Sequence, residues 1–201
     1  MIKIIPNIIN KKEQNLLNKK IQDNNFPWYY YDNVIEGRDN NYKKYKNITE
    51  TYAWVHSLFL LPNGVNSSYF DDFKIILSEF EKKEKIKIKE LLRIRIRKTF
   101  YCKGHNLKKY NFPHVDLCNF SNYKSLLYYF EDSDGDTIFF KERYNKRKKF
   151  DLTNLTIDKR NTPVKGNAVY FDGDIFHAGN CPVNYNTRTV LNFDFKINES
   201  V

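Results

Sequence analysis

The chain has 201 residues, 16% of which are aromatic, and only 7 are Gly and 6 are Pro. This length is sufficient for one domain with a substantial hydrophobic core, and the composition excludes an intrinsically disordered chain. The formal net charge of +10 is compatible with binding to nucleic acid or to a membrane surface, although solvated lysines explain it more simply.

Strands and helices are predicted in the first part of the chain. Residues 2–9 are interpreted as an edge strand, the position that tolerates the proline they contain. Asn10 and Glu13 have the spacing of a capping box, which predicts that a helix follows. The aromatic residues 26–31 are interpreted as a wall packed on the core.

A loop, a strand and a second helix are predicted next. Residues 32–50 are polar and predict a loop, and residues 51–61 alternate in the manner of a strand. Ser68 and Asp71 are expected to begin a helix over residues 69–84.

From residue 85 the apolar residues recur with a period of two, which predicts a long half-buried strand. Its aliphatic face carries Ile86, Ile88, Leu92, Ile94 and Ile96. Its opposite face carries Lys87, Lys89, Arg93, Arg95 and Arg97. If the alternation continues, Thr99 and Tyr101 follow on this second face.

Further strands are predicted over residues 124–130, 137–140, 168–171 and 188–195. The basic residues 141–149 are interpreted as a solvated hairpin extension in preference to an electrostatic funnel for an anionic substrate. In the last strand, one face is expected to carry Arg188, Val190, Asn192 and Asp194.

His114 and Asp116 are the strongest candidates for metal ligands. In an extended segment they point to the same side, about 7 Å apart along the strand. His177 is the best candidate for a third ligand. Two imidazoles and one carboxylate beside open positions describe the facial triad of non-haem Fe(II) oxygenases. A planar guanidinium at Arg188 is suited to clamp a carboxylate, which would be that of 2-oxoglutarate.

A zinc site is the alternative use of this region. Cys118 has the same parity as the two predicted ligands before it. The second possible ligand set is therefore His114, Cys118, His177 and Cys181. This set lacks the closely spaced Cys and His pairs that are usual in structural zinc sites.

In its order of motifs the chain resembles the 2-oxoglutarate/Fe(II)-dependent oxygenases, and within them uncharacterised members from bacteriophages and marine microbes with a prolyl-4-hydroxylase-like core. Besides the predicted ligands, the resemblance rests on Leu92-Arg93-Ile94-Arg95-Ile96, Leu127-Tyr128-Tyr129, Gly135-Asp136-Thr137, Phe171-Asp172-Gly173 and His177-Ala178-Gly179. It implies a mainly β fold with flanking α-helices, closed as a double-stranded β-helix (jelly roll, cupin-like). Within one domain over residues 1–201, residues 1–90 would pack on a core formed by residues 91–201.

The resemblance also implies the cofactors and their contacts. Fe(II) would be held by His114, Asp116 and His177, and 2-oxoglutarate would be clamped by Arg188. Further candidates for contacts in the cofactor cavity are Tyr101, Thr137, Tyr129 and Asn192. For the first and last of these four a purely structural role is equally open. O2 is the other reactant, and ascorbate is the expected reductant.

The motifs do not determine the substrate. The pattern of Gly135 and Thr137 is similar to that of prolyl-4-hydroxylase-like members and favours hydroxylation of a protein side chain such as proline. The positive charge leaves oxidation of a nucleic-acid base or methyl group as an alternative. A cupin-like binding module without catalysis is the third possibility.

The sequence predicts a cytoplasmic protein without a membrane partner, in the host cytoplasm if the gene is viral. No apolar run approaches the ~18–20 residues that cross a bilayer, and the start lacks a signal-peptide pattern. Cys102, Cys118 and Cys181 form no regular disulfide framework, which indicates a reducing compartment. The sequence does not indicate an oligomeric state.

Overall fold

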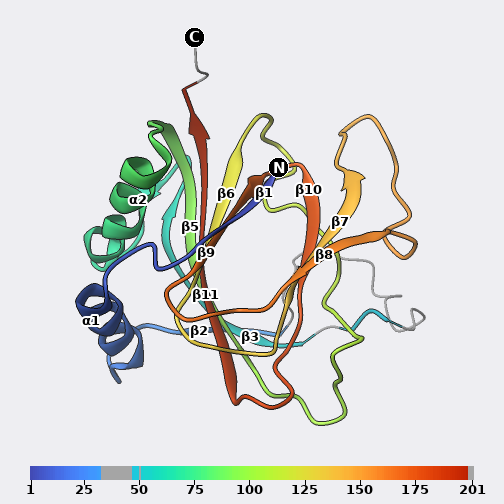
Figure 1. Ribbon diagram of the computed structural model, residues 1–201, viewed down its shortest axis with the longest axis horizontal. Helices are drawn as coiled ribbons and strands as arrows, with labels where there is room; N and C mark the ends of the chain where they lie inside the picture. Colours follow the sequence, from blue (N-terminus) through green and yellow to red (C-terminus); the bar gives the residue numbers. More distant parts are fainter. Residues whose placement is uncertain (33–46, 50, 199–201) are drawn as a thin grey trace.

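The computed structural model describes residues 1–32, 47–49 and 51–198. Its named strands form two sheets, in which all the described strand pairs are antiparallel (Figure 1). The large sheet has the order β1 (Ile2–Ile5), β9 (Ala168–Asp172), β6 (Lys124–Tyr129), β11 (Thr187–Ile197), β5 (Ile88–Phe100), β3 (Ala53–Leu60) and β2 (Tyr29–Tyr31). The short β4 (Gly64–Val65) pairs with β3. The small sheet has the order β10 (Ile175–Gly179), β7 (Thr137–Arg143) and β8 (Ile157–Asn161).

The helices α1 (Lys11–Gln22) and α2 (Phe70–Glu84) cover one face of the large sheet (Figure 1). On this side Leu17 of α1 and Phe80 of α2 belong to one buried cluster with Ile94 of β5 and Phe193 of β11. The helices therefore bury the aliphatic face that the period of two predicts for β5.

The other face of the large sheet looks onto the small sheet. Leu127, Tyr129 and Val190 of the large sheet share a second buried cluster with Phe139 of β7 and Ile175 of β10. Two sheets packed face to face, with helices outside, form a jelly roll. The predicted fold class is therefore confirmed.

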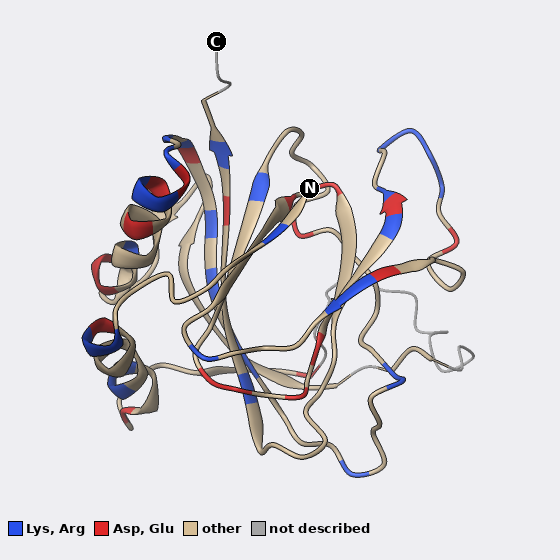
Figure 2. Ribbon diagram, in the orientation of Figure 1, with Lys and Arg blue, Asp and Glu red and all other residues tan. Residues whose placement is uncertain are grey.

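The basic face of β5 is directed toward the space between the sheets. Arg93, Arg95 and Arg97 line a pocket there, and Figure 2 shows Lys and Arg segments recurring along this strand. The strand is thus apolar toward the helices and cationic toward the interior of the jelly roll.

The start of the chain differs from its prediction. β1 ends at Ile5, because Asn7 has a left-handed φ of 45° and the Ile8 N–H donates to Gly166 O at 3.0 Å. These features turn the chain away from the sheet before residue 9, so the predicted strand is too long.

The two helix starts have different outcomes. Asn10 and Glu13 form the predicted capping box at α1. The prediction that Ser68 begins α2 is wrong, since the N-cap is Tyr69 and no side chain caps this helix. Instead, Ser67 Oγ accepts the Tyr69 N–H at 3.2 Å.

Four strands of the described residues have no counterpart in the sequence prediction, namely β2, β4, β8 and β10. β2 lies in the segment that the sequence analysis interprets only as an aromatic wall, and β4 has just two residues. β8 carries mostly exposed polar side chains, so it lacks the alternation by which strands are recognised. β10 contains the predicted ligand His177 and is a short buried strand without polar alternation. Most of the predicted loop over residues 32–50 lies outside the described residues.

The basic residues 141–149 span the end of β7 and its connection to β8, with which β7 pairs as a hairpin. Lys and Arg mark this connection in Figure 2, and residues 146–149 are exposed. Within the described part of the chain, no helix has both the length and the apolar character needed to cross a bilayer.

Neighbouring leucines of α1 provide a test of this packing. Leu17 is 2% exposed and Leu16 is 55% exposed. We expect Leu17→Ala to lower the free energy of unfolding by about 2–5 kcal/mol, because it leaves a cavity beneath the helix. The matched Leu16→Ala should stay within about 0.5 kcal/mol of the wild type in urea unfolding. Equal effects of both changes would contradict the placement of α1.

Candidate metal centre

Three predicted ligands come together between the two sheets. The ligand atoms of His114, Asp116 and His177 all lie within 4.8 Å of one another. His177 Nε2 is 3.2 Å from Asp116 Oδ2, and His114 Nε2 is 3.9 Å from Asp116 Oδ1. The side chains of His114, Asp116 and His177 are 16%, 5% and 6% exposed, respectively. The group is therefore compact and largely shielded from solvent.

The backbone fixes the two histidines relative to each other. His114 and His177 form an antiparallel bridge in which each N–H donates to the other residue's carbonyl at 2.9 Å. Each ring places Nδ1 3.1 Å from a carbonyl two residues earlier, at Phe112 and Ile175. With Nδ1–H donating to these carbonyls, both Nε2 lone pairs are left to face Asp116.

Arg93 of β5 holds the carboxylate of the group. Arg93 Nη2 donates to Asp116 Oδ1, and Arg93 Nε donates to Asp194 Oδ2 at 2.8 Å. Ser125 Oγ donates to the other oxygen of Asp194 at 2.6 Å. Burial alone would raise the pKa of Asp116, but Arg93 and His177 hold this pKa well below its ordinary value. Asp116 is therefore ionised at neutral pH.

The three side chains fit a divalent transition metal. Burial and the neighbouring His177 lower the pKa of His114 to about 3, so this imidazole is neutral at pH 7. Asp116 Oδ2 is buried and accepts no hydrogen bond within the described part of the chain. A carboxylate oxygen facing imidazole lone pairs needs a cation between them, and two nitrogens with one oxygen are donors that iron accepts.

The cysteines of the alternative zinc set do not join this group. Cys118 is exposed, and Cys181 Sγ lies 3.1 Å from Thr51 Oγ1. In the described ranges the metal-binding group consists of the two histidines and the aspartate. The geometry therefore favours the facial triad over the zinc site.

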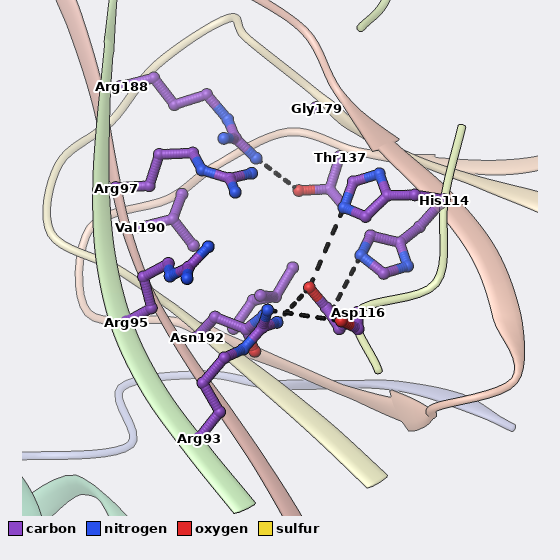
Figure 3. A pocket seen from close by; sticks show the side chains of 12 residues that line it. Arg93, Arg95, Arg97, His114, Asp116, Thr137, Gly179, Arg188, Val190 and Asn192 are labelled. Carbon is purple, nitrogen blue, oxygen red and sulfur yellow. Dashed lines mark hydrogen bonds and ion pairs between the residues drawn. The ribbon is translucent and has the colours of Figure 1, made fainter. Parts of the chain in front are cut away.

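Arg188 lies in the same pocket, on β11 opposite Thr99 of β5 (Figure 3). Its Nε donates to Gly135 O, and its Nη2 donates to Thr137 Oγ1 at 2.8 Å. Gly135 makes room for it, because a Cβ there would be 2.8 Å from Arg188 Cδ. Its hydrogen bonds within the described residues go to neutral groups, which leaves its charge available to a ligand.

Of the other four predicted cofactor contacts, two line the pocket and two do not. Thr137 and Asn192 line the pocket. Tyr129 is buried behind Thr137, with its hydroxyl 2.8 Å from Thr137 Oγ1 and a hydrogen bond from Asn161 Nδ2 at 3.1 Å. Tyr101 follows the end of β5, is 48% exposed and is not among the residues that line the pocket. The structure therefore does not bring Tyr101 to the site.

The sequence analysis did not assign Arg93, Arg95 and Arg97 to the site, although all three line the pocket (Figure 3). Their parity was visible, but a basic face on a half-buried strand is usually solvated. The available signal was that this face was expected to continue to Tyr101, a predicted contact in the cofactor cavity.

Comparison with solved structures identifies the same fold in 2-oxoglutarate oxygenases. An oxidoreductase of the 2OG-Fe(II) oxygenase family from Burkholderia pseudomallei aligns over 97% of this chain and 84% of its own, with 11% identity and a TM-score of 0.64. The non-heme alpha-ketoglutarate-dependent epimerase SnoN aligns over 97% and 78%, with 8% identity and a TM-score of 0.61. A prolyl hydroxylase from Trichoplax adhaerens, in complex with a peptide fragment, aligns over 97% and 83%, with 11% identity and a TM-score of 0.59.

No protein-family model and no curated protein sequence matches the chain. At such low sequence identity the structural likeness establishes the fold alone. The chain thus has the jelly-roll fold of 2-oxoglutarate oxygenases, and the narrower resemblance to phage and marine-microbe members stays a prediction.

Metal binding can be tested without turnover. We expect His114→Ala to weaken Co(II) binding by about 100-fold or more, because loss of a direct ligand exceeds the 10–100-fold cost of losing an outer contact. His105→Ala is the matched control, since His105 Nε2 bonds Asn180 Oδ1 outside the ligand group. Titration calorimetry measures both affinities. Unchanged binding by His114→Ala would exclude this metal site.

Arg93 should be essential for stability in metal-free protein. Arg93→Met leaves two buried carboxylates without their cation and should cost about 3–5 kcal/mol in chelator-treated protein. Arg143→Met is the control, because its ion pairs with Asp172 and Asp174 are on the surface and should contribute at most about 1 kcal/mol. Urea unfolding at pH 7 measures both, and similar losses would refute the buried ion cluster.

Proposed function

We propose that the protein is an Fe(II)- and 2-oxoglutarate-dependent dioxygenase that hydroxylates its substrate and releases succinate and CO2. The observation that carries the proposal is the convergence of His114, Asp116 and His177 in one pocket with Arg188. The shared fold supports it, but the arrangement of these four side chains is specific to the chemistry.

The three ligands suit iron, since two imidazole nitrogens and one carboxylate oxygen would hold the ion and leave further positions for ligands. His114 and His177 present their Nε2 atoms, and Asp116 supplies the negative charge. Fe(II), with 2-oxoglutarate and O2, supplies oxidation of a substrate C–H bond coupled to decarboxylation of the keto acid, with ascorbate as the expected reductant. Zinc in the same place has no redox chemistry.

Arg188 would bind the distal carboxylate of 2-oxoglutarate. It is buried without an ion-pair partner among the described residues, and its burial lowers its pKa. Gly135 O and Thr137 Oγ1 use only part of its donor fork, so a bidentate contact to a carboxylate remains available. Tyr129 orients Thr137 from behind and thus supports the clamp indirectly.

The proposed reaction class does not determine the substrate. The resemblance to prolyl-4-hydroxylase-like members favours a protein side chain such as proline, and a solved neighbour is a prolyl hydroxylase with a peptide fragment. Other neighbours are an epimerase and a carbocyclase, so this fold serves several outcomes. Oxidation of nucleic acid remains the alternative substrate class.

Turnover of 2-oxoglutarate tests the proposal. Incubation with Fe(II), ascorbate and O2 should release succinate from the wild type and none from His114→Ala. Arg188→Gln should raise the KM for 2-oxoglutarate about 10- to 100-fold, because charge-assisted hydrogen bonds are lost. The surface variant Arg143→Gln should behave as wild type. Absence of both turnover and 2-oxoglutarate binding in the wild type would favour a non-catalytic module.

A further inference from the structure

An aromatic surface lies on the large sheet, on the face opposite the metal pocket. Ile94 and Ile96 of β5 are buried on this face in the cluster that contains the helices. By alternation Phe100 continues the same face of the strand, but it lies outside that cluster. The helices therefore leave the last part of this face uncovered.

Four aromatic side chains form a continuous row there. Across the strands, Trp54 of β3 pairs with Tyr30 of β2, so both side chains point to the same face. The ring centre of Phe100 is 5.0 Å from that of Trp54 and 5.7 Å from that of Tyr52. The ring centres of Tyr52 and Tyr30 are 6.1 Å apart. These four residues, in the order Trp54, Phe100, Tyr52 and Tyr30, are the aromatic row.

Three of these rings are open to solvent. Tyr30 is 65% exposed, and Tyr52 and Trp54 are each 40% exposed. The interpretation of residues 26–31 as a wall packed on the core is thus correct for Phe26, which is 4% exposed, but not for Tyr30. Contiguous exposed apolar surface generally marks a place where another molecule binds.

A lysine lies at the Trp54 end of the aromatic row. Trp54 pairs across the strands with Lys98 of β5. Lys98 Nζ is 6.0 Å from the ring centre of Phe100 and 6.0 Å from that of Trp28. Lys98 is partly exposed, so its charge is available at the edge of the row.

A hollow of about 370 Å³ lies at the other end of the aromatic row. Tyr30 and Tyr52 line it together with Lys103, Lys109 and, as the carboxylate among its described lining residues, Asp32. Positive charge therefore lies at both ends of the row, in a chain whose formal net charge is +10. The surface is complementary to a ligand that has flat rings and negative charge.

Single-stranded nucleic acid has this combination. Its unpaired bases stack on aromatic side chains while its phosphates lie beside lysines, and stacking does not require a particular base. In a duplex the base faces are covered by neighbouring base pairs, so the aromatic row could not reach them. A membrane-surface anchor is typically an amphipathic helix, whereas these side chains belong to strands and the ends of strands.

We propose that the aromatic row and the lysines at its two ends bind single-stranded nucleic acid by base stacking and phosphate contacts. This surface is separate from the proposed function. Arg93 and Arg97, at the alternate positions of β5, line the metal pocket on the other face of the sheet. The surface would hold a strand without placing a base at the metal, so it is a docking surface and does not define what is oxidised.

The test measures the fluorescence anisotropy of labelled oligo(dT), oligo(rU) and duplex DNA, each about 20 nucleotides long, mixed with the full chain. We expect both single strands to bind more tightly than the duplex. Trp54→Ala and Tyr52→Ala should each weaken this binding about 5- to 150-fold, the effect of removing one stacking ring. Trp54→Phe keeps a ring and should retain most of the affinity. The ratio of oligo(dT) to oligo(rU) binding shows whether DNA or RNA is preferred.

Lysine variants separate this surface from the general positive charge of the chain. Lys98→Gln should lower the slope of log affinity against log salt concentration by about 0.7, the value for one phosphate contact to a single strand. The matched control is Lys74→Gln, because Lys74 Nζ also lies over a ring, 5.1 Å from the ring centre of Phe70 on α2. It should leave the slope unchanged.

Three results would overturn the surface. The single strands do not bind the wild type, the duplex binds as tightly as the single strands, or Trp54→Ala and Tyr52→Ala keep the wild-type affinity. Joint replacement of Lys146, Lys148 and Lys149 by Gln locates the binding in the last case, since its loss there would assign the nucleic acid to residues 141–149. Anionic lipid vesicles that bind in place of oligonucleotides would identify a membrane surface instead. These measurements need no turnover, so their outcome is independent of the proposed function.

Discussion

The ion cluster of Arg93, Asp116 and Asp194 connects the core of the protein to its site. Arg93 and Asp194 are cross-strand neighbours at the centre of the large sheet, whereas Asp116 belongs to a segment outside the named strands. A buried guanidinium between two carboxylates is favourable only as a complete set, because each member left alone is a desolvated charge. The sheet therefore fixes Asp116 electrostatically, and the ionised carboxylate in turn faces the two histidines.

The two faces of the long strand β5 lie in different environments. Ile94 and Ile96 complete the core beneath the helices, while the alternate positions deliver arginines into the space between the sheets. Such a strand is costly as a purely structural element, since its charged face is withdrawn from water. For Arg93 this cost is offset by Asp116 and Asp194, the two buried carboxylates that it contacts.

Much of this arrangement could be predicted from the sequence, because it follows from alternation and order. The period of two located β5 and β11, and it correctly placed Arg188, Val190, Asn192 and Asp194 on one face. The spacing of His114 and Asp116 indicated a shared direction, which the structure shows. These inferences depend on local geometry, and local geometry is what a sequence encodes most directly.

The remainder depends on distant contacts. β8 has no apolar alternation because it is an exposed edge, so only pairing with β7 defines it. Tyr101 has the parity of a pocket residue, but β5 ends just before it and its side chain turns to solvent. The orientation of the arginines depended on knowing that the opposite sheet closes over them. Parity tells which residues share a face, but not what that face meets.

The mutual backbone bridge of His114 and His177 has a consequence for metal choice. Because hydrogen bonds in both directions set the spacing of the two rings, half of the coordination geometry exists before any ion arrives. A site that is already formed does not select one metal ion over another by refolding around it. Nickel, copper and zinc generally bind such nitrogen and oxygen donors more tightly than ferrous iron. Protein recovered from cells is therefore expected to carry whichever ion its surroundings supplied, and the proposed activity would depend on its history of metal exposure.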